Sequence, residues 1–186
     1  MDQADRLMRV ERHRGFSLIE ILVAVFVIVM VASVVMLNVS SPTRDRLAQD
    51  AAQQFARTLN YALEEAEYAN AVYGLFAERA TSDSRDILFT YKYIEDNRWV
   101  SANDQVLSQA LRFDAELEVD LEVEGTLVDI KARPVETEQW QPVLRLLPSG
   151  EMSAGRLIVT DDNDTSRFWR VEWTIFGGAT AILEQR

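Results

Sequence analysis

Hydrophobic and polar positions divide the chain into three stretches with different periodicities. Residues 16–39 are almost all apolar. In residues 40–74 apolar side chains recur every three or four positions, which is the spacing of one face of a helix. Residues 75–186 contain short runs in which apolar and polar side chains alternate, as they do in β-strands. The pattern predicts an α+β fold, in which a long N-terminal helix packs on antiparallel β-sheets.

The apolar stretch is long enough to span a membrane, since about 20 apolar residues cross the hydrocarbon core of a bilayer. The basic residues ahead of it are Arg6, Arg9, Arg12 and Arg14. By the positive-inside rule they place the N-terminus in the cytoplasm and the rest of the chain outside. A secretory signal peptide has a shorter core, followed by its small-residue cleavage site. Here the small residue, Gly15, precedes the core, so a cut there removes residues 1–15 and leaves the helix on the protein.

The amphipathic stretch predicts a helix that continues from the membrane segment. Its apolar face consists of Leu47, Ala51, Phe55, Leu59, Ala62, Ala66, Ala69 and Tyr73. We expect Pro42 to kink or interrupt the helix and Gly74 to cap its C-terminus. The apolar face needs a partner, which the strands that follow can supply, so this face is predicted to be core.

Alternation of apolar and polar side chains predicts seven strands, at residues 87–94, 117–123, 127–132, 143–147, 156–160, 168–176 and 179–183. Turns are expected at Glu124–Thr126 and at Gly177–Gly178. Segments 74–86 and 133–142 are expected to be surface loops. One strand face is predicted to lie in the core and carries Trp169, Val171, Trp173 and Ile175.

One predicted strand places a row of carboxylates on a single face. The row consists of Asp114, Glu116, Glu118, Asp120, Glu122 and Glu124. Lys131 and Arg133 are expected to offset two of these charges across a hairpin. Two interpretations stay open: a solvated face that discourages sheet-to-sheet aggregation, and a contact with a basic neighbouring subunit or channel partner. A paired-carboxylate hydrolase fits poorly, because such a pair needs a cleft and not a flat row. Trp140 lies in a loop-like segment and is a second candidate contact if it is exposed.

The composition excludes several kinds of chemistry. The chain has no cysteine, and its one histidine, His13, lies ahead of the apolar stretch. Disulfides, thiol nucleophiles and a histidine-dependent catalytic triad are therefore excluded from the body of the protein. The formal net charge of −11 argues against binding to nucleic acid. We expect no cofactor and no enzymatic activity.

The segment from Asp161 to Thr165 has some features of a calcium loop. Asp161, Asn163, Thr165 and Glu172 match positions 1, 3, 5 and 12 of an EF-hand. Ser166 stands where an EF-hand has glycine, and the flanking segments are predicted strands. A β-turn is the better interpretation, and no metal ligand is predicted.

The string RGFSLIEILVAVFVIVMVASVVMLN, residues 14–38, resembles the class III signal of type IV pilins and pseudopilins. The resemblance implies that a prepilin peptidase cuts between Gly15 and Phe16 and that the new amino group of Phe16 is methylated. It also implies that Glu20, the fifth residue after the cut, pairs with the N-terminal amine of a neighbouring subunit. An alternative role for Glu20 is a favourable contact with the positive end of the helix dipole.

The remainder of the chain resembles the H-type minor pseudopilins of the type II (general) secretion pathway. The strings that carry this resemblance are LNVSSPTRDRLAQDAAQQFARTLNYALEEAEYANAVYGL, DNRWV and VLRLLPSGEMSAGRLIVTDD. The resemblance implies a type IV pilin-like fold and a low-abundance subunit near the tip of a periplasmic pseudopilus. Residues 75–186 would then be periplasmic. The implied partners are prepilin peptidase, the I, J and K minor pseudopilins, the major pseudopilin and lipids of the inner membrane.

Two alternatives stay open. One is a minor pilin of a type IV pilus, which shares the leader and the architecture. Many of those pilins carry a C-terminal disulfide, and the absence of cysteine here favours secretion. The other is a periplasmic binding domain whose N-terminus serves as a plain signal anchor, and which keeps that N-terminus intact.

Overall fold

The computed structural model of this 186-residue chain describes residues 18–39, 41–81, 83–131, 140–162 and 164–185. The chain forms two structural units, which divide between Ser41 and Pro42. The first contains helix α1 (Leu18–Val39). The second contains nearly all of helix α2 (Ser41–Ala69) and all the strands.

Helix α1 presents apolar side chains around its surface. Leu18 is 82% exposed, Phe26 65% and Met30 63%. Among the residues that the structure describes, no helix combines the length and the apolar composition that a membrane span requires.

Helix α2 begins as a separate helix at Ser41, next to the expected interruption at Pro42, but it ends earlier than the sequence predicts. Pro42 lies in its first turn, where proline is tolerated because the N–H it lacks has no partner there. At the other end Asn70 adopts a positive φ of 49°, and Ala71 N–H donates to the Ala66 carbonyl at 3.1 Å. Asn70 therefore terminates the helix. The expectation that Gly74 caps it is wrong.

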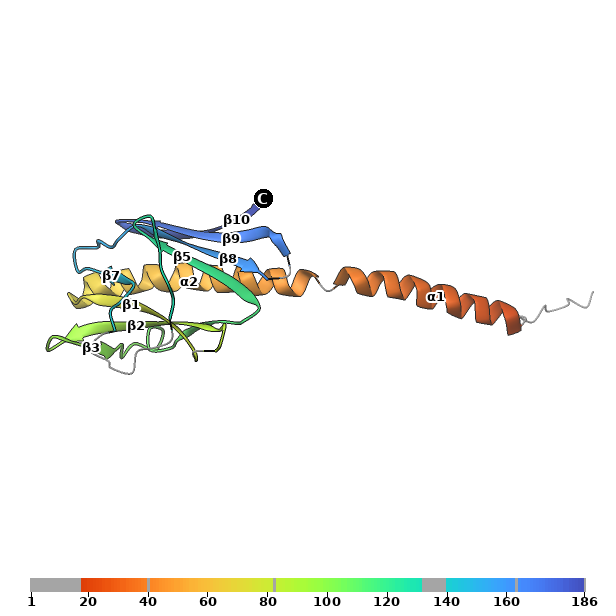
Figure 1. Ribbon diagram of the computed structural model, residues 1–186, viewed down its shortest axis with the longest axis horizontal. Coiled ribbons are helices and arrows are strands. Elements are labelled where there is room, and N and C mark those ends of the chain that lie inside the picture. The colour runs from red at the N-terminus through yellow and green to blue at the C-terminus, as the bar shows by residue number, and fades with distance from the viewer. Residues whose placement is uncertain (1–17, 40, 82, 132–139, 163, 186) are drawn as a thin grey trace, which may run out of the picture. The chain divides into compact units, whose positions relative to one another are not determined.

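Two antiparallel sheets enclose α2, one above and one below it in Figure 1. The first has the order β3-β2-β1-β7, with β4 also paired to β2. Its strands are β1 (Tyr73–Arg79), β2 (Ile87–Glu95), β3 (Arg98–Ser101), β4 (Leu111–Phe113) and β7 (Leu144–Leu146). The second has the order β10-β9-β8-β5-β6. Its strands are β5 (Leu117–Val123), β6 (Thr126–Leu127), β8 (Gly155–Asp161), β9 (Asp164–Thr174) and β10 (Gly177–Gln185). The α+β prediction is confirmed.

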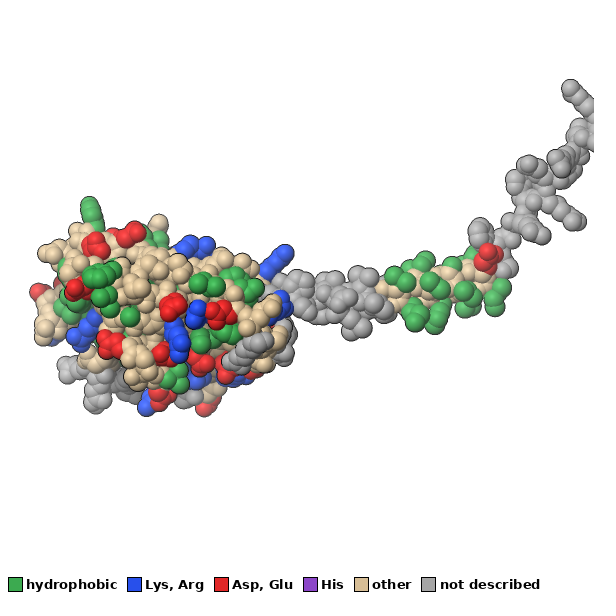
Figure 2. Space-filling view, turned by 90° about the horizontal axis from the view of Figure 1, so that it is seen from above, with side chains coloured by type: hydrophobic (Ala, Val, Ile, Leu, Met, Phe, Trp, Pro, Cys, Tyr) green, Lys and Arg blue, Asp and Glu red, His purple; other side chains and the backbone are tan. Residues whose placement is uncertain are grey.

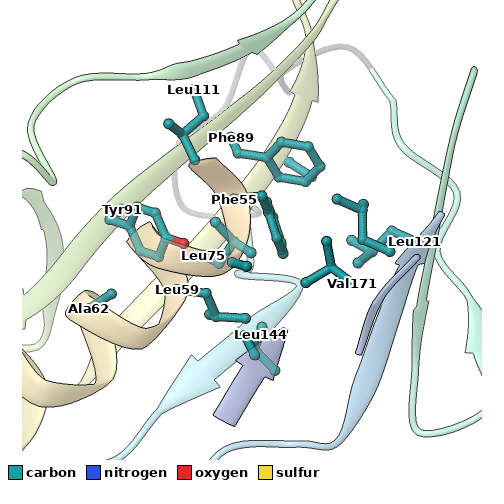
Figure 3. Packing of buried hydrophobic residues seen from close by; sticks show 14 of the residues in the cluster. Phe55, Leu59, Ala62, Leu75, Phe89, Tyr91, Leu111, Leu121, Leu144 and Val171 are labelled. Carbon is teal, nitrogen blue, oxygen red and sulfur yellow. The ribbon is translucent and has the colours of Figure 1, made fainter. Parts of the chain in front are cut away.

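Phe55 lies at the centre of the core, where α2 meets both sheets (Figure 3). Its ring centroid is 5.2 Å from that of Phe89 and 6.4 Å from that of Phe113, both in the first sheet. It is 5.9 Å from the ring of Trp173 in the second sheet. Phe55 has no exposed surface. One helical side chain thus fills the space between two sheets, which predicts a large cost for its removal.

Strand β1 occupies the centre of the first sheet, where the sequence predicted a loop at 74–86. Its residues 73–78 are all buried. One face packs on α2, and the other is covered by Trp140 and Trp99, which both contact Phe76. A strand buried on both faces does not alternate, so its sequence carries no strand signal. Gly74 belongs to this packing, because a Cβ there would lie 2.8 Å from Pro142.

The β9–β10 hairpin also differs from the prediction. Strand β9 ends at Thr174 and β10 begins at Gly177, so the turn consists of Ile175 and Phe176. Gly177 and Gly178 follow the turn with φ of 79° and 76°. Ile175 is 50% exposed, so its expected core position is wrong. The predicted core position of the other three residues of that face agrees with the structure. Val171 and Trp173 are buried, and Trp169 is partly buried against the core.

The predicted strand at 127–132 is also wrong beyond Leu127. Strand β6 stops there, and Val128 N–H still donates to the Leu121 carbonyl at 2.8 Å. The chain then leaves the second sheet, because the Lys131 carbonyl accepts from Arg79 N–H of β1 at 2.9 Å. This segment therefore connects the two sheets.

Replacing Phe55 by alanine should destabilise the domain by about 3–5 kcal/mol, because it opens a cavity between the helix and both sheets. Phe176→Ala removes the same atoms from a side chain that is 68% exposed and should cost less than about 0.5 kcal/mol. Urea unfolding of the two variants measures both values. Equal costs would show that Phe55 does not organise the core.

Candidate functional site

The residues of the predicted processing site lie at the start of the chain. Gly15 and Phe16 lie outside the described residues. Glu20 lies in the first turn of α1 and is exposed. Its neighbours Ile19 and Ile21 are 68% and 56% exposed. An acidic side chain therefore stands among hydrophobic ones at the start of this helix, as Figure 2 shows.

The position of Glu20 has two physical consequences. A carboxylate in the first turn interacts favourably with the positive end of the helix dipole. A carboxylate surrounded by apolar surface becomes costly when that surface leaves water, unless a cation accompanies it. Burial of α1 against lipid or other helices therefore favours a cation close to Glu20.

The acidic row follows the predicted alternation along β5. Glu118 and Asp120 are exposed, whereas Leu117 and Leu121 are buried. The counter-charge comes from a different strand than expected. Arg156 of β8 lies opposite Glu122 and binds its carboxylate at 2.6 Å. Lys131 pairs with Asp129 at 3.1 Å instead, and Arg133 lies outside the described residues.

Other members of the row have partners of their own. Asp114 lies 3.5 Å from Arg112, and Glu124 accepts a hydrogen bond of 2.6 Å from the Ser153 hydroxyl. The outer face of the second sheet continues with Arg170, which binds Glu184 at 2.6 Å. Figure 2 shows acidic and basic side chains mixed on this face. Glu118 and Asp120 lie opposite the uncharged Thr160 and Ile158, so neither faces a cation across the ladder to β8, although Glu118 is close enough to Arg85 to interact with it electrostatically.

Trp140 is only 7% exposed, so its candidacy as a contact residue is wrong. Its ring centroid lies 4.6 Å from that of Phe76, and the Lys92 ammonium lies 4.4 Å above its ring. The residues before it show no periodicity from which this burial could be predicted. Trp140 holds the connection to β7 against the outer face of the first sheet, so it belongs to the fold rather than to a contact surface.

Asp104 is a polar residue that the sequence did not single out. It accepts hydrogen bonds from the N–H groups of Val106 at 2.7 Å and Leu107 at 3.0 Å, and from the Tyr61 hydroxyl at 3.0 Å. These bonds, the one from Leu107 first, lower the pKa of Asp104. They tie the connection between β3 and β4 to α2. An aspartate whose side chain accepts from the backbone N–H two residues further on, as Asp104 does from Val106, is typical of such a turn.

The calcium interpretation places together residues that the structure separates. Asp161 pairs with Asp164 at one end of the β8–β9 hairpin, whereas Glu172 pairs with Arg156 five residues further back. At about 3.3 Å per residue the separation is on the order of 16 Å. Asp162 binds Arg85 at 2.9 Å, and this hydrogen bond lowers the pKa of Asp162. Within the described ranges, no three His, Cys, Asp or Glu side chains are grouped to hold a metal ion.

Comparison with known proteins provides an independent test of the sequence resemblance. Residues 12–36 match the family described as the prokaryotic N-terminal methylation motif. The chain is 28% identical to type II secretion system protein H of Aeromonas hydrophila over 169 residues, which is 88% of this chain and 89% of that protein.

Solved structures show the same fold. One structure of the minor pseudopilin EpsH from the type II secretion system of Vibrio cholerae aligns with a TM-score of 0.54 and 23% identity, over 75% of this chain and 94% of EpsH. Another aligns with a TM-score of 0.51 and 21% identity, over 74% of this chain and 96% of EpsH. The resemblance of this chain to the H-type minor pseudopilins of type II secretion is thus confirmed in its N-terminal motif, its sequence and its fold.

Proposed function

We propose that this chain is a minor pseudopilin, a structural subunit at or near the tip of the pseudopilus of a type II secretion system. The observation that carries the proposal is the order in which two features follow one another along the chain. A methylation motif at residues 12–36 directly precedes a domain with the fold of a minor pseudopilin. A plain signal anchor accounts for the hydrophobic stretch but leaves the methylation motif unexplained. The similarity to protein H of Aeromonas hydrophila favours secretion over a type IV pilus.

In this proposal the N-terminus is processed by prepilin peptidase. The enzyme removes the basic leader, residues 1–15, by cutting between Gly15 and Phe16, and methylates the amine of Phe16. Residues 16–39 hold the protein in the inner membrane, with the N-terminus originally in the cytoplasm. Helix α2, Ser41–Ala69, follows the membrane segment, and the strands from Tyr73 onward complete the periplasmic domain. The exposed apolar side chains along α1 support this arrangement, because such a surface requires lipid or other apolar helices around it.

The mechanism of assembly depends on Glu20. Cleavage creates an ammonium group at Phe16, four residues ahead, which is about 6 Å along a helix. The carboxylate of Glu20 in one subunit pairs with this amine in its neighbour. In a low dielectric such a pair is strongly attractive, and an unpaired carboxylate carries a large penalty. The pair therefore sets the axial register as helices pass from lipid into the filament core, where apolar contacts replace lipid contacts.

The proposed role in export is mechanical. With the I, J and K minor pseudopilins this subunit primes assembly of the major pseudopilin, and the growing pseudopilus pushes proteins through an outer-membrane channel. No catalytic step is assigned to the chain. The exposed carboxylates of the acidic row, above all Glu118 and Asp120, are proposed to contact a basic surface of a neighbouring subunit, since opposite charges steer association and select partners.

Deletion of the chain from a type II-secreting bacterium should leave the exported proteins in the periplasm, and the wild-type chain should restore their release. Glu20→Ala should remain membrane-bound and processed but fail to restore release, because its helix lacks the partner of the neighbouring amine. Ile21→Ala is the matched control on the same helix and should restore release. Assaying the exported protein in the medium, together with membrane fractionation, tests this role. Full release with Glu20→Ala would refute the pairing.

Neutralising the acidic row should affect association rather than stability. Glu118→Gln with Asp120→Asn alters two exposed side chains and should change the free energy of unfolding by less than about 0.5 kcal/mol. The same pair should lower the amount of other pseudopilins that co-purifies with the chain at low salt. A matched control is Glu184→Gln, which removes a carboxylate that Arg170 already binds. Unchanged co-purification would leave the row with only a solubilising role.

A further inference from the structure

The turn of the β9–β10 hairpin carries two large apolar residues, Ile175 and Phe176. They are 50% and 68% exposed. Neither has a positive φ, whereas Gly177 and Gly178 after them do, so the backbone of the turn accepts most residue types at these two positions and does not require apolar ones. A single exposed apolar residue needs no explanation, but several at one place mark a contact surface.

The backbone of this turn is held firmly. Phe176 N–H donates to the Thr174 hydroxyl oxygen at 3.3 Å, and that hydroxyl donates to the Gly177 carbonyl at 3.0 Å. The Ile175 carbonyl accepts from Met152 N–H at 2.9 Å. Gly177 lies against Leu63 of α2, since a Cβ there would be 2.7 Å from that side chain. A rigidly presented aromatic loses little conformational freedom on binding and makes an effective anchor.

Further exposed apolar residues lie at the same end of the domain. Leu147 is 37% exposed. Its turn is closed by the Leu146–Met152 bridge and adjoins the hairpin because Met152 N–H donates to the Ile175 carbonyl. The same turn touches the end of α2, where Gly150 lies against the Glu67 side chain and the next residue, Tyr68, is 89% exposed. We call these four residues the helix-end patch: Tyr68, Leu147, Ile175 and Phe176. Figure 2 shows hydrophobic side chains at this end of the domain.

The surface beside the hairpin is uneven. An open hollow of about 510 Å³ lies next to Ile175 and is also lined by Glu172, Trp173 and Thr180. A projecting aromatic beside a hollow can interlock with a shaped protein surface, whereas a lipid headgroup region offers no fixed shape to match. Shape complementarity of this kind is what specific protein interfaces share.

The charges around the patch select the kind of partner. The segments that carry the patch, residues 64–69, 144–155 and 172–178, contain the carboxylates Glu64, Glu65, Glu67, Glu151 and Glu172, of which Glu172 lies 3.7 Å from Arg170. Within these three segments the one cation is Arg145. The adjoining β2–β3 hairpin adds two cations, Lys92 and Arg98, and two carboxylates, Glu95 and Asp96, so this end carries more carboxylates than cations. The electrostatic field of these groups extends over a Debye length of about 8 Å. It repels an anionic bilayer and also repels the same acidic end of a second copy.

We propose that the helix-end patch docks into an apolar pocket rimmed by Lys and Arg on a different pseudopilin, with Phe176 as the anchor. The choice of a pseudopilin as partner rests on the proposed function. The patch itself is inferred from exposure, rigidity and charge. Apolar anchor and acidic surroundings together specify a pocket that is apolar inside and basic at its rim.

The test uses the full chain in secreting cells. Benzoylphenylalanine replaces Phe176, and the other pseudopilins of the same system are epitope-tagged one at a time. Thr165, exposed near the opposite end of β9, carries the same cross-linker as the matched control. On irradiation, position 176 should give one shifted band that contains a tagged pseudopilin, and position 165 should give much less of it. No such band, a band containing only two copies of this chain, or equal bands at both positions would overturn the proposal.

A second measurement does not depend on the cross-linker. Phe176→Ser should lower co-precipitation of the cross-linked pseudopilin at least about tenfold, as truncation of an interface anchor does, with an unchanged melting temperature. Raising the salt concentration should weaken the wild-type complex, because opposite charges surround the anchor. Undiminished co-precipitation of the serine variant would contradict the anchor role and leave the proposed function intact. Continued secretion after deletion of the chain would refute the proposed function itself.

Discussion

The domain depends on one helix that two sheets share. Along one face of α2, Ala52, Phe55, Leu59, Ala62 and Ala66 have no exposed surface, and they cover the apolar faces of both sheets. Each large side chain buried there contributes roughly 1.5–3 kcal/mol, and the alanines let the strands approach closely. The helix also protects a sheet edge, since the Asn60 amide exchanges two hydrogen bonds with the backbone of Ala179 in β10. Without α2 neither sheet would have a core.

The elements that the sequence predicted well are those whose surroundings are asymmetric. Helix α2 and strand β5 each have one buried and one solvated face, so the periodicity of their side chains indicates the element and most of its buried face. The predicted apolar face of α2 is wrong at its ends, because Leu47 is 40% exposed, Ala69 is exposed and Tyr73 belongs to β1. Strand β1 was missed because both of its faces are covered, one by α2 and the other by a segment that lies more than 60 residues later in the sequence. Trp140 in that segment is buried by its contact with Phe76 of β1. Pro142 in the same segment lies so close to β1 that position 74 requires glycine. Long-range packing of this kind leaves no local signal.

The functional features also differ in whether a local sequence pattern reveals them. The processing motif is local, because a peptidase reads a short string beside a hydrophobic helix, and it could be recognised without a structure. Surfaces for partners arise only from the folded domain. Ile175 reads as a core position from its place in an alternating strand, yet the hairpin turns there and exposes it. Glu122 reads as one of six equal carboxylates, yet a strand remote in sequence brings Arg156 to it. In the folded domain Glu122 is paired with a cation on β8, whereas Glu118 and Asp120 lie opposite uncharged residues of that strand.

The account as a whole requires that proteolysis create the cation for Glu20. Mass spectrometry of the native protein, purified from a bacterium with an active prepilin peptidase, measures this most directly. A mass that begins at methylated Phe16 agrees with the account, and Gly15→Leu, which places a bulky side chain at the cleavage site, should retain its leader as the matched control. A native chain that still carries residues 1–15 would contradict it.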